Sequence, residues 1–276
     1  GMPPPGDIRN CMEALANTEP LMSELMHYRF PEGVLAGQSF GNLFLAALNG
    51  ISGSFDEAVS RMSEVLAITG RVLPVTTADV QLVAEFENGA SVTGESKIFY
   101  CKKREDCRIR RVRLSPENPK ALPAALAAIR EADMIILGPG SLYTSIIPNL
   151  LVEGIVEAIQ DSDALKIYVC NVMTQEGETE GYTVSDHISA LFHHSCRNLF
   201  DICLCNSSPI PKGVAAKYAQ EGASPLYADA GPCAALGVEV ISRPIATVDN
   251  GFVRHDPGHL ARELILLHAE RSVRIA

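Results

Sequence analysis

A turn rich in glycine and hydroxyl groups follows the apolar run at residues 134–137. Gly138 and Gly140 would let the backbone approach a ligand without a Cβ atom in the way, and their amides can form a concave site for an anion. Ser141 and Thr144 add hydroxyls beside the start of the next expected helix, where the helix dipole favours phosphate. The pattern predicts phosphate binding, although ordinary strand-to-helix turns use the same residue types.

The glycine turn matches neither of two common phosphate-binding motifs. It lacks the Gly-Lys-Ser/Thr ending of a P-loop and the spacing of the Gly-x-Gly-x-x-Gly dinucleotide fingerprint. Polar loops also follow the apolar runs that end near residues 172 and 206. Because ligands bind outside the carboxyl ends of parallel strands, we expect the three loops to share one cleft.

Elements of alternating type must position these loops. Apolar periodicity and turn residues predict a layered α/β fold with a mainly parallel sheet. Helices are expected at residues 41–51, 54–68, 123–133, 150–162, 184–195 and 259–270, and strands at 134–138, 165–172 and 199–207. With no Gly/Ser/Pro linker and no internal repeat, we expect one continuous domain over residues 1–276.

An insertion around residues 78–114 is expected to form a hairpin. Asn88 and Gly89 are expected to supply the positive φ angles of its tight turn. The basic run from Cys101 to Leu114 alternates in part with apolar residues, which favours a strand with one charged, solvated face. His187 is expected on a helix capped by Ser185 or Asp186, with His193 and His194 on that helix's surface.

Composition excludes several classes of protein. The chain has 276 residues, 47% of them hydrophobic, and a formal charge of −10, which argues against nucleic-acid binding. With no membrane-spanning run and no signal peptide, we expect a cytoplasmic protein. The eight cysteines lie mostly in apolar runs and form no Cys-x-x-Cys pair, so the sequence predicts buried thiols and no metal site.

Four long motifs resemble those of one bacterial family. They are MPPPGDIRN, RFPEGVLAGQSFGNLFLAALNGISG, ILGPGSLYTSIIPNLLVEGI and YVCNVMTQEGETEGYTVSDHI. They resemble the YvcK-like gluconeogenesis-factor family of the CofD-like superfamily, related to 2-phospho-L-lactate transferase. The resemblance covers essentially the whole chain and implies a Rossmann-like three-layer α/β sandwich. The GGGTG loop typical of the family is absent from this sequence, and without it half of the phosphate cradle would be missing.

The resemblance also implies a function. It suggests a regulator of carbon metabolism and of cell-wall synthesis or cell shape that binds a nucleotide or UDP-sugar, as a homo-oligomer, with no settled catalytic activity. The alternative is a phospho-lactate-type transferase that uses a nucleotide-diphosphate-linked donor. The ligand residues that it implies are Gly138, Gly140, Ser141 and Thr144 at the diphosphate, Asn149 nearby, and Asn171, Thr174 and Arg254 in the same cleft.

Four polar residues remain open between a structural and a ligand-binding role. Asp7 is a natural helix N-cap, but with Asn10 it could lie at the cleft edge, where a carboxylate could help hold Mg²⁺ on a bound diphosphate. Asn42 could contact the ligand, while Ser39 before it reads as an N-cap. Arg254 could instead form a surface pair with Asp256.

Overall fold

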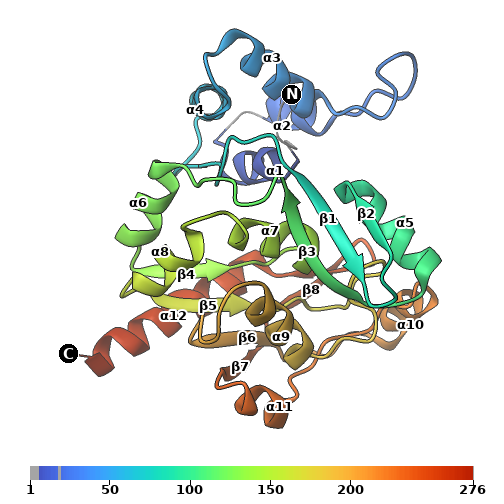
Figure 1. The fold of residues 1–276 in the computed structure, drawn as a ribbon, viewed down its shortest axis with the longest axis vertical. Coiled ribbons are helices and arrows are strands. Elements are labelled where there is room, and N and C mark those ends of the chain that lie inside the picture. Colours follow the sequence, from blue (N-terminus) through green and yellow to red (C-terminus); the bar gives the residue numbers. More distant parts are fainter. Residues whose placement is uncertain (1–5, 18–19, 276) are drawn as a thin grey trace. The chain divides into compact units, whose positions relative to one another are not determined.

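The computed structural model describes residues 6–17 and 20–275, with side chains through residue 271. The chain divides into two compact units, one of residues 1–80 and 119–125 and the other of residues 81–118 and 126–276 (Figure 1). The unit boundary after residue 80 falls close to the expected start of the insertion. The expectation of one continuous domain stays a prediction.

The first unit is helical. Its helices are α1 (Gly6–Leu15), α2 (Pro20–His27), α3 (Phe40–Ile51) and α4 (Phe55–Val65). Ser39 caps α3 by accepting a hydrogen bond from the amide of Asn42, in line with its expected N-cap role. Ser54 caps α4 through the amide of Glu57. Apolar side chains of all four helices form one buried core: Met12, Met26, Leu45, Leu48, Phe55, Ala58, Val59, Met62 and Leu66.

The second unit is built on a four-stranded parallel sheet. Its strands β4 (Met134–Leu137), β5 (Leu165–Val169), β6 (Ile202–Asn206) and β7 (Glu239–Arg243) lie side by side in this order (Figure 1). Because successive side chains point to opposite faces, Ile167 of β5 packs toward helix α12 (Pro257–Ile275), while Tyr168 packs toward α9 (Val184–His194). The predicted parallel α/β fold is therefore confirmed.

Two small antiparallel sheets complete the second unit. One has the order β2 (Ser91–Thr93), β1 (Gln81–Phe86), β3 (Ile109–Ser115), and the other pairs β8 (Ala246–Asp249) with β9 (Phe252–His255). The β1–β2 hairpin turns where predicted, but only Gly89 has a positive φ, so the expectation for Asn88 was wrong. The strand predicted from Cys101 is also corrected, since residues 101–105 belong to helix α5 (Glu95–Glu105) and only β3 alternates.

The remaining elements connect these sheets. They are α6 (Pro123–Glu131), the π-helical turn η1 (Leu142–Ile146), α7 (Ile147–Leu150), α8 (Ile155–Asp161), α10 (Lys212–Gln220) and α11 (Ala230–Ala235). The helix expected over 150–162 is broken, because Gly154 adopts a φ of 93° before α8. Thr183, not Ser185 or Asp186, caps α9, with Asp186 completing a capping box. No described helix is long and apolar enough to cross a membrane.

Candidate ligand-binding pocket

A pocket of about 630 Å³ opens at the carboxyl ends of β4 and β5. Its lining comes from the loops that follow these two strands, from helices α5 and α10, from residues 221 and 223, and from strand β9. This volume lies within the range of small-molecule sites, which is about 300–1,000 Å³. Of the three loops expected to share one cleft, the two after β4 and β5 do so, whereas residues 207–213 after β6 contribute nothing to the lining.

The two glycines of the loop after β4 have different roles. Gly138 has a φ of 83°, and a Cβ atom there would lie 3.0 Å from the Cδ1 of Ile146 and 3.1 Å from the carbonyl oxygen of Val169. Glycine at 138 is therefore required by the turn itself. At Gly140 an added Cβ would make only ordinary contacts, the nearest being 3.4 Å from the Cβ of Ser145. Gly140 leaves its backbone open to the pocket.

A buried carboxylate holds the turn that follows this loop. Glu178 is 4% exposed, and its side chain accepts hydrogen bonds from the amide of Tyr143 at 3.1 Å and from the hydroxyl of Thr144 at 2.7 Å. Burial raises the pKa of Glu178 to about 6, although the hydrogen bonds it accepts act in the opposite direction. Glu178 therefore occupies the hydroxyl of Thr144, which was expected to bind a phosphate.

Polar contacts on both sides hold the loop after β5 in place. Thr174 is buried. Its hydroxyl oxygen accepts a hydrogen bond from the Ser224 amide at 2.8 Å, and its own amide donates to the carbonyl oxygen of Ser224. On the other side, Lys103 of α5 donates to Glu176 at 2.6 Å. The Phe99 ring fills the space where Gly177 would carry a Cβ, since that atom would lie 2.2 Å from the ring. Helix α5 and this loop therefore form one wall of the pocket.

The β8–β9 hairpin supplies the pocket's positive charge. Arg254 is exposed, its guanidinium lies 5.5 Å from the ring centre of Phe252, and within the described residues it has no ion-pair partner. The alternative role of Arg254, a surface pair with Asp256, is not seen, and Asp256 pairs with His259 at 3.2 Å. Beside Arg254, the Nε2 of His255 bonds the carbonyl oxygen of Cys170 at 3.1 Å, which ties the hairpin to the end of β5.

The structure brings five of the predicted site residues together. Gly140, Ser141, Asn171, Thr174 and Arg254 all line the one pocket. Within the described part of the chain, the side chains of Ser141, Asn171 and Arg254 make no hydrogen bond, so their donors remain available. Thr174 is different, since its hydroxyl oxygen already accepts from the chain.

Three other predicted residues stand outside this lining. Gly138 lies in the same turn, and the geometry of that turn requires a glycine there. The hydroxyl of Thr144 donates a hydrogen bond to Glu178. Asn149 is exposed on α7 and donates to the carbonyl oxygen of Ser145 at 2.6 Å. These three residues support the loop geometry and do not line the pocket.

The last three predicted residues belong to the first unit. Asp7 lies inside the first turn of α1, which begins at Gly6, so it does not precede the helix as an N-cap would. Asn10 is exposed and accepts a hydrogen bond from the guanidinium of Arg9 at 2.7 Å. The side-chain oxygen of Asn42 is buried and has no hydrogen-bond partner among the described residues. Their ligand roles stay predictions.

Sequence reasoning missed several residues of the pocket. Phe99 and Tyr218 contribute aromatic side chains, and Glu221 contributes a carboxylate. Phe99 was missed because its segment was read as part of a hairpin, and Tyr218 because no helix was predicted over residues 212–220.

One histidine outside this pocket is also corrected. His194 was expected on a helix surface, but it is half-buried and accepts a hydrogen bond from the Val112 amide at 3.0 Å. Burial lowers the pKa of His194 to about 4.

The residues present fit Mg²⁺ only as a companion of a bound phosphate. Among the described residues, the one group of three or more His, Cys, Asp or Glu side chains close enough to share an ion consists of cysteines. Glu176 and Glu221 line the pocket separately. Because Mg²⁺ is commonly held by one or two carboxylates together with substrate phosphates, a bound diphosphate would have to complete the coordination.

Comparison with known proteins agrees with the α/β fold. The family model for 2-phospho-L-lactate transferase CofD matches residues 1–246. The crystal structure of protein BH3568 from Bacillus halodurans superposes with a TM-score of 0.91 at 45% identity, covering 96% of this chain and 84% of that one. The fold and the pocket thus define a protein of the CofD type.

Curated relatives narrow the class further. The gluconeogenesis factor of Bacillus subtilis is 48% identical over 270 residues, covering 98% of this chain and 84% of the relative. The putative gluconeogenesis factor of Thermoanaerobacterium thermosulfurigenes is 51% identical over 265 residues, covering 96% and 82%. That of Clostridium acetobutylicum is longer, and this chain spans 59% of it. The chain belongs to the CofD family, in the group of its members named gluconeogenesis factors.

Proposed function

We propose that this protein binds a nucleotide-diphosphate-linked sugar, of the UDP-sugar class, at the carboxyl ends of β4 and β5. The observation that carries the proposal is the convergence of Gly140, Ser141 and Arg254 on one pocket of about 630 Å³. We further propose that this binding regulates carbon metabolism, and cell-wall synthesis or cell shape, in bacteria. The family membership supports the metabolic part of this role.

The diphosphate would lie between the glycine loop and the β8–β9 hairpin. The open backbone at Gly140 and the hydroxyl of Ser141 offer neutral donors, and Arg254 offers a permanent positive charge with a planar fork. In a chain of formal charge −10, an unpaired arginine beside a glycine turn is a specific attraction for an anion. Mg²⁺ held by Glu176 or Glu221 could accompany the diphosphate.

Other lining residues suit the uncharged parts of the ligand. Phe99 and Tyr218 present aromatic surface to the pocket, and such surfaces commonly pack against bases and sugar rings. Asn171, whose side-chain amide makes no other hydrogen bond in the described part of the chain, can donate to and accept from a polar ring. The pocket therefore offers both charge recognition and ring packing.

A ligand screen tests the proposal. Thermal unfolding of the purified chain is measured with UDP-N-acetylglucosamine, UDP-glucose, GDP and NAD, each with and without Mg²⁺, because a ligand that binds only the folded state raises the melting temperature. We expect a rise that is confined to UDP-sugars and that saturates with concentration. Equal rises with all the nucleotides, or none with any, would contradict the proposed ligand class.

The match to the 2-phospho-L-lactate transferase model favours one alternative, an active transferase. In that case the same pocket would hold a nucleotide-diphosphate-linked donor, and a second molecule would accept its phosphorylated group. The test is incubation with such a donor, a deazaflavin-like acceptor and Mg²⁺, followed by mass analysis of the products. A transferred product would establish an enzyme, whereas UDP-sugar binding without product would leave the regulatory proposal standing.

A further inference from the structure

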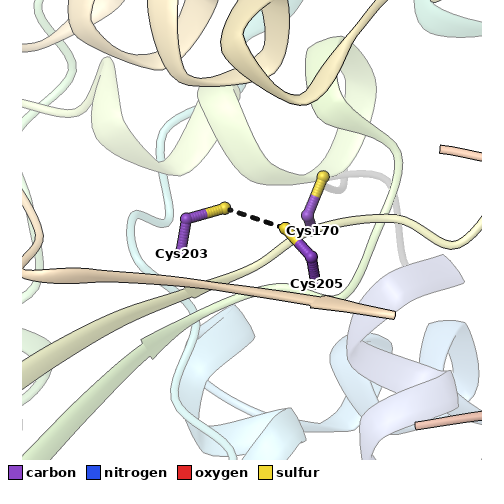
Figure 2. A group of neighbouring side chains, drawn as sticks. All are labelled: Cys170, Cys203 and Cys205. Carbon is purple, nitrogen blue, oxygen red and sulfur yellow. Dashed lines mark hydrogen bonds between the residues drawn. The ribbon is translucent and has the colours of Figure 1, made fainter. Parts of the chain in front are cut away.

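Three cysteine thiols meet inside the second unit, on the sheet face that α9 covers (Figure 2). Cys203 and Cys205 are alternate residues of β6, so their side chains leave the same face of the strand. Cys170 directly follows β5, and its amide donates to the carbonyl oxygen of Leu204 at 3.0 Å, which places it beside Cys205 across the parallel ladder. The sheet itself brings the three thiols together.

The distances between the sulfur atoms are those of a ligand set. The Sγ atoms of Cys203 and Cys205 are 3.7 Å apart, and all three Sγ atoms lie within 4.8 Å of one another. A metal ion about 2.3 Å from each of three thiolates in a trigonal plane separates the sulfurs by about 4.0 Å. The cluster therefore needs a movement of less than about 1 Å to close on an ion.

We propose that Cys170, Cys203 and Cys205 form a binding site for one soft monovalent metal ion, with Cu(I) as the ion that fits best. Thiolate ligands select Cu(I) over hard ions such as Mg²⁺. Structural zinc is almost always four-coordinate, and within the described residues no fourth His, Cys, Asp or Glu joins this group. The thiols are at most 1% exposed, so solvent does not supply a fourth ligand either.

The other buried cysteines provide a contrast within the same unit. Cys101 is 4% exposed and its sulfur contacts the guanidinium of Arg104, while the sulfur of Cys233 donates to Asp229. Neither of these thiols takes part in a group that could share an ion, as far as the structure describes the chain. A buried cysteine can serve as a small apolar residue anywhere in a core. The cluster differs from such ordinary packing because three thiols meet at one place.

The cluster lies next to the pocket. Asn171 lines the pocket and is the next residue after Cys170, and His255, which also lines it, bonds the Cys170 carbonyl oxygen. Each thiol that becomes a ligand releases its proton to solvent, so binding changes neither the oxidation state of sulfur nor that of the metal.

The test is an anaerobic titration of the reduced protein with Cu(I) buffered by a chromogenic chelator. We expect one Cu(I) per chain, with an X-ray absorption spectrum that shows three sulfur neighbours at about 2.3 Å. Cys205→Ala should weaken Cu(I) binding by about 100-fold or more, because a structural ligand is lost. The matched control is Cys101→Ala, which removes a buried thiol outside the cluster and should leave the affinity unchanged.

The spectrum keeps the test independent of how well the variants fold. Circular dichroism and thermal unfolding of the metal-free variants establish that each is folded before its affinity is compared. The proposal is overturned if the wild-type chain takes no Cu(I) from the chelator, if the absorption spectrum shows two or four sulfur neighbours, or if Cys101→Ala weakens binding as much as Cys205→Ala. Tighter binding of Zn²⁺ than of Cu(I) would also overturn it.

Discussion

The two ends of the parallel sheet both carry a hollow, and the larger one is at the end that we do not assign to a ligand. The hollow at the amino ends of β5, β6 and β7 has a volume of about 850 Å³, against about 630 Å³ at the carboxyl ends. At the amino ends, Lys166 donates to the carbonyl oxygen of Ser162 at 2.7 Å, and Arg271 pairs with Glu239. These two cations are satisfied by the chain itself, whereas Arg130, which also lines this hollow, has no ion pair within the described residues.

The carboxyl end differs in combining unpaired groups with a supported turn. Arg254 has no acidic partner in the described residues, and Ser141 and Asn171 keep their side-chain donors free. The turn that follows Ser141 is held by the buried Glu178. A site needs rigid support together with free binding groups, and this end of the sheet has both. Volume alone would have selected the other end.

The largest expected effect contrasts a carboxylate from each end. Glu178 and Asp201 both accept a hydrogen bond from a backbone amide, from Tyr143 and Lys166 respectively, but Asp201 is exposed. Glu178→Ala should lower the free energy of unfolding by about 3 kcal/mol, because the buried amide of Tyr143 and hydroxyl of Thr144 lose their acceptor. Asp201→Ala should cost less than about 1 kcal/mol, since water replaces the lost bond. Urea denaturation measures both.

Glu178→Gln is the control for size and shape. It keeps an acceptor oxygen and should lose about 1 kcal/mol or less. If Glu178→Ala and Asp201→Ala are equally stable, the buried carboxylate does not support the loop. The carboxyl end of the sheet would then be no more rigid than the amino end.

The second prediction compares two arginines. Arg254 lines the carboxyl-end pocket and the exposed Arg130 lines the amino-end hollow. Arg254→Ala should weaken UDP-sugar binding by about 10- to 100-fold, because charge-assisted hydrogen bonds to the diphosphate are lost, whereas Arg130→Ala should leave it unchanged. Isothermal titration calorimetry gives both dissociation constants. A stronger effect of Arg130→Ala would move the site to the other end.

Much of this contrast could be predicted from sequence, and part of it could not. Strong apolar runs bounded by glycine or asparagine gave the parallel strands, so Gly140, Ser141 and Asn171 were correctly expected at neighbouring strand ends. The role of Glu178 depends on a contact between residues 35 positions apart, which no local pattern encodes. Helix α5 was missed because its charged face and short length resemble those of an exposed strand.

The three clustered thiols illustrate the same limit. Cys203 and Cys205 could be assigned to one face of a strand from their spacing, but Cys170 joins them only through the order and register of β5 and β6. Register is a tertiary property, and a chain without a Cys-x-x-Cys pair gives no sequence signal of a shared site.

The third prediction concerns pH. The pKa of Glu178 is raised by burial from 4.5 to about 6, so the folded chain holds this proton when the unfolded chain has lost it. Its contribution to stability is therefore complete below pH 4.5 and falls by about 2 kcal/mol as the pH rises through 6. His194, with its pKa lowered to about 4, has the opposite trend, because acid favours the unfolded chain.

The two trends are separated by a difference measurement. Subtracting the unfolding free energies of Glu178→Gln from those of the wild type at pH 4 to 7 cancels the histidines and leaves the Glu178 contribution. Asp201→Asn supplies the control at the amino end of the sheet. A wild-type minus Glu178→Gln difference that does not change across this range would show that the carboxylate is not held as the structure indicates.

The smallest expected effect sharpens the comparison most, because it changes a single hydroxyl at each end. Ser141→Ala should weaken UDP-sugar binding by about two- to tenfold, the range expected for one neutral hydrogen bond, and should leave stability nearly unchanged. Ser162 at the amino end is 7% exposed, and its hydroxyl already accepts from the amide of Ala164 at 3.2 Å. Ser162→Ala should therefore lower stability by about 1 kcal/mol and leave affinity unchanged. If the carboxyl-end pocket binds the ligand, Ser141→Ala changes affinity and Ser162→Ala changes stability. If the two hollows were equivalent, both substitutions would have the same effect.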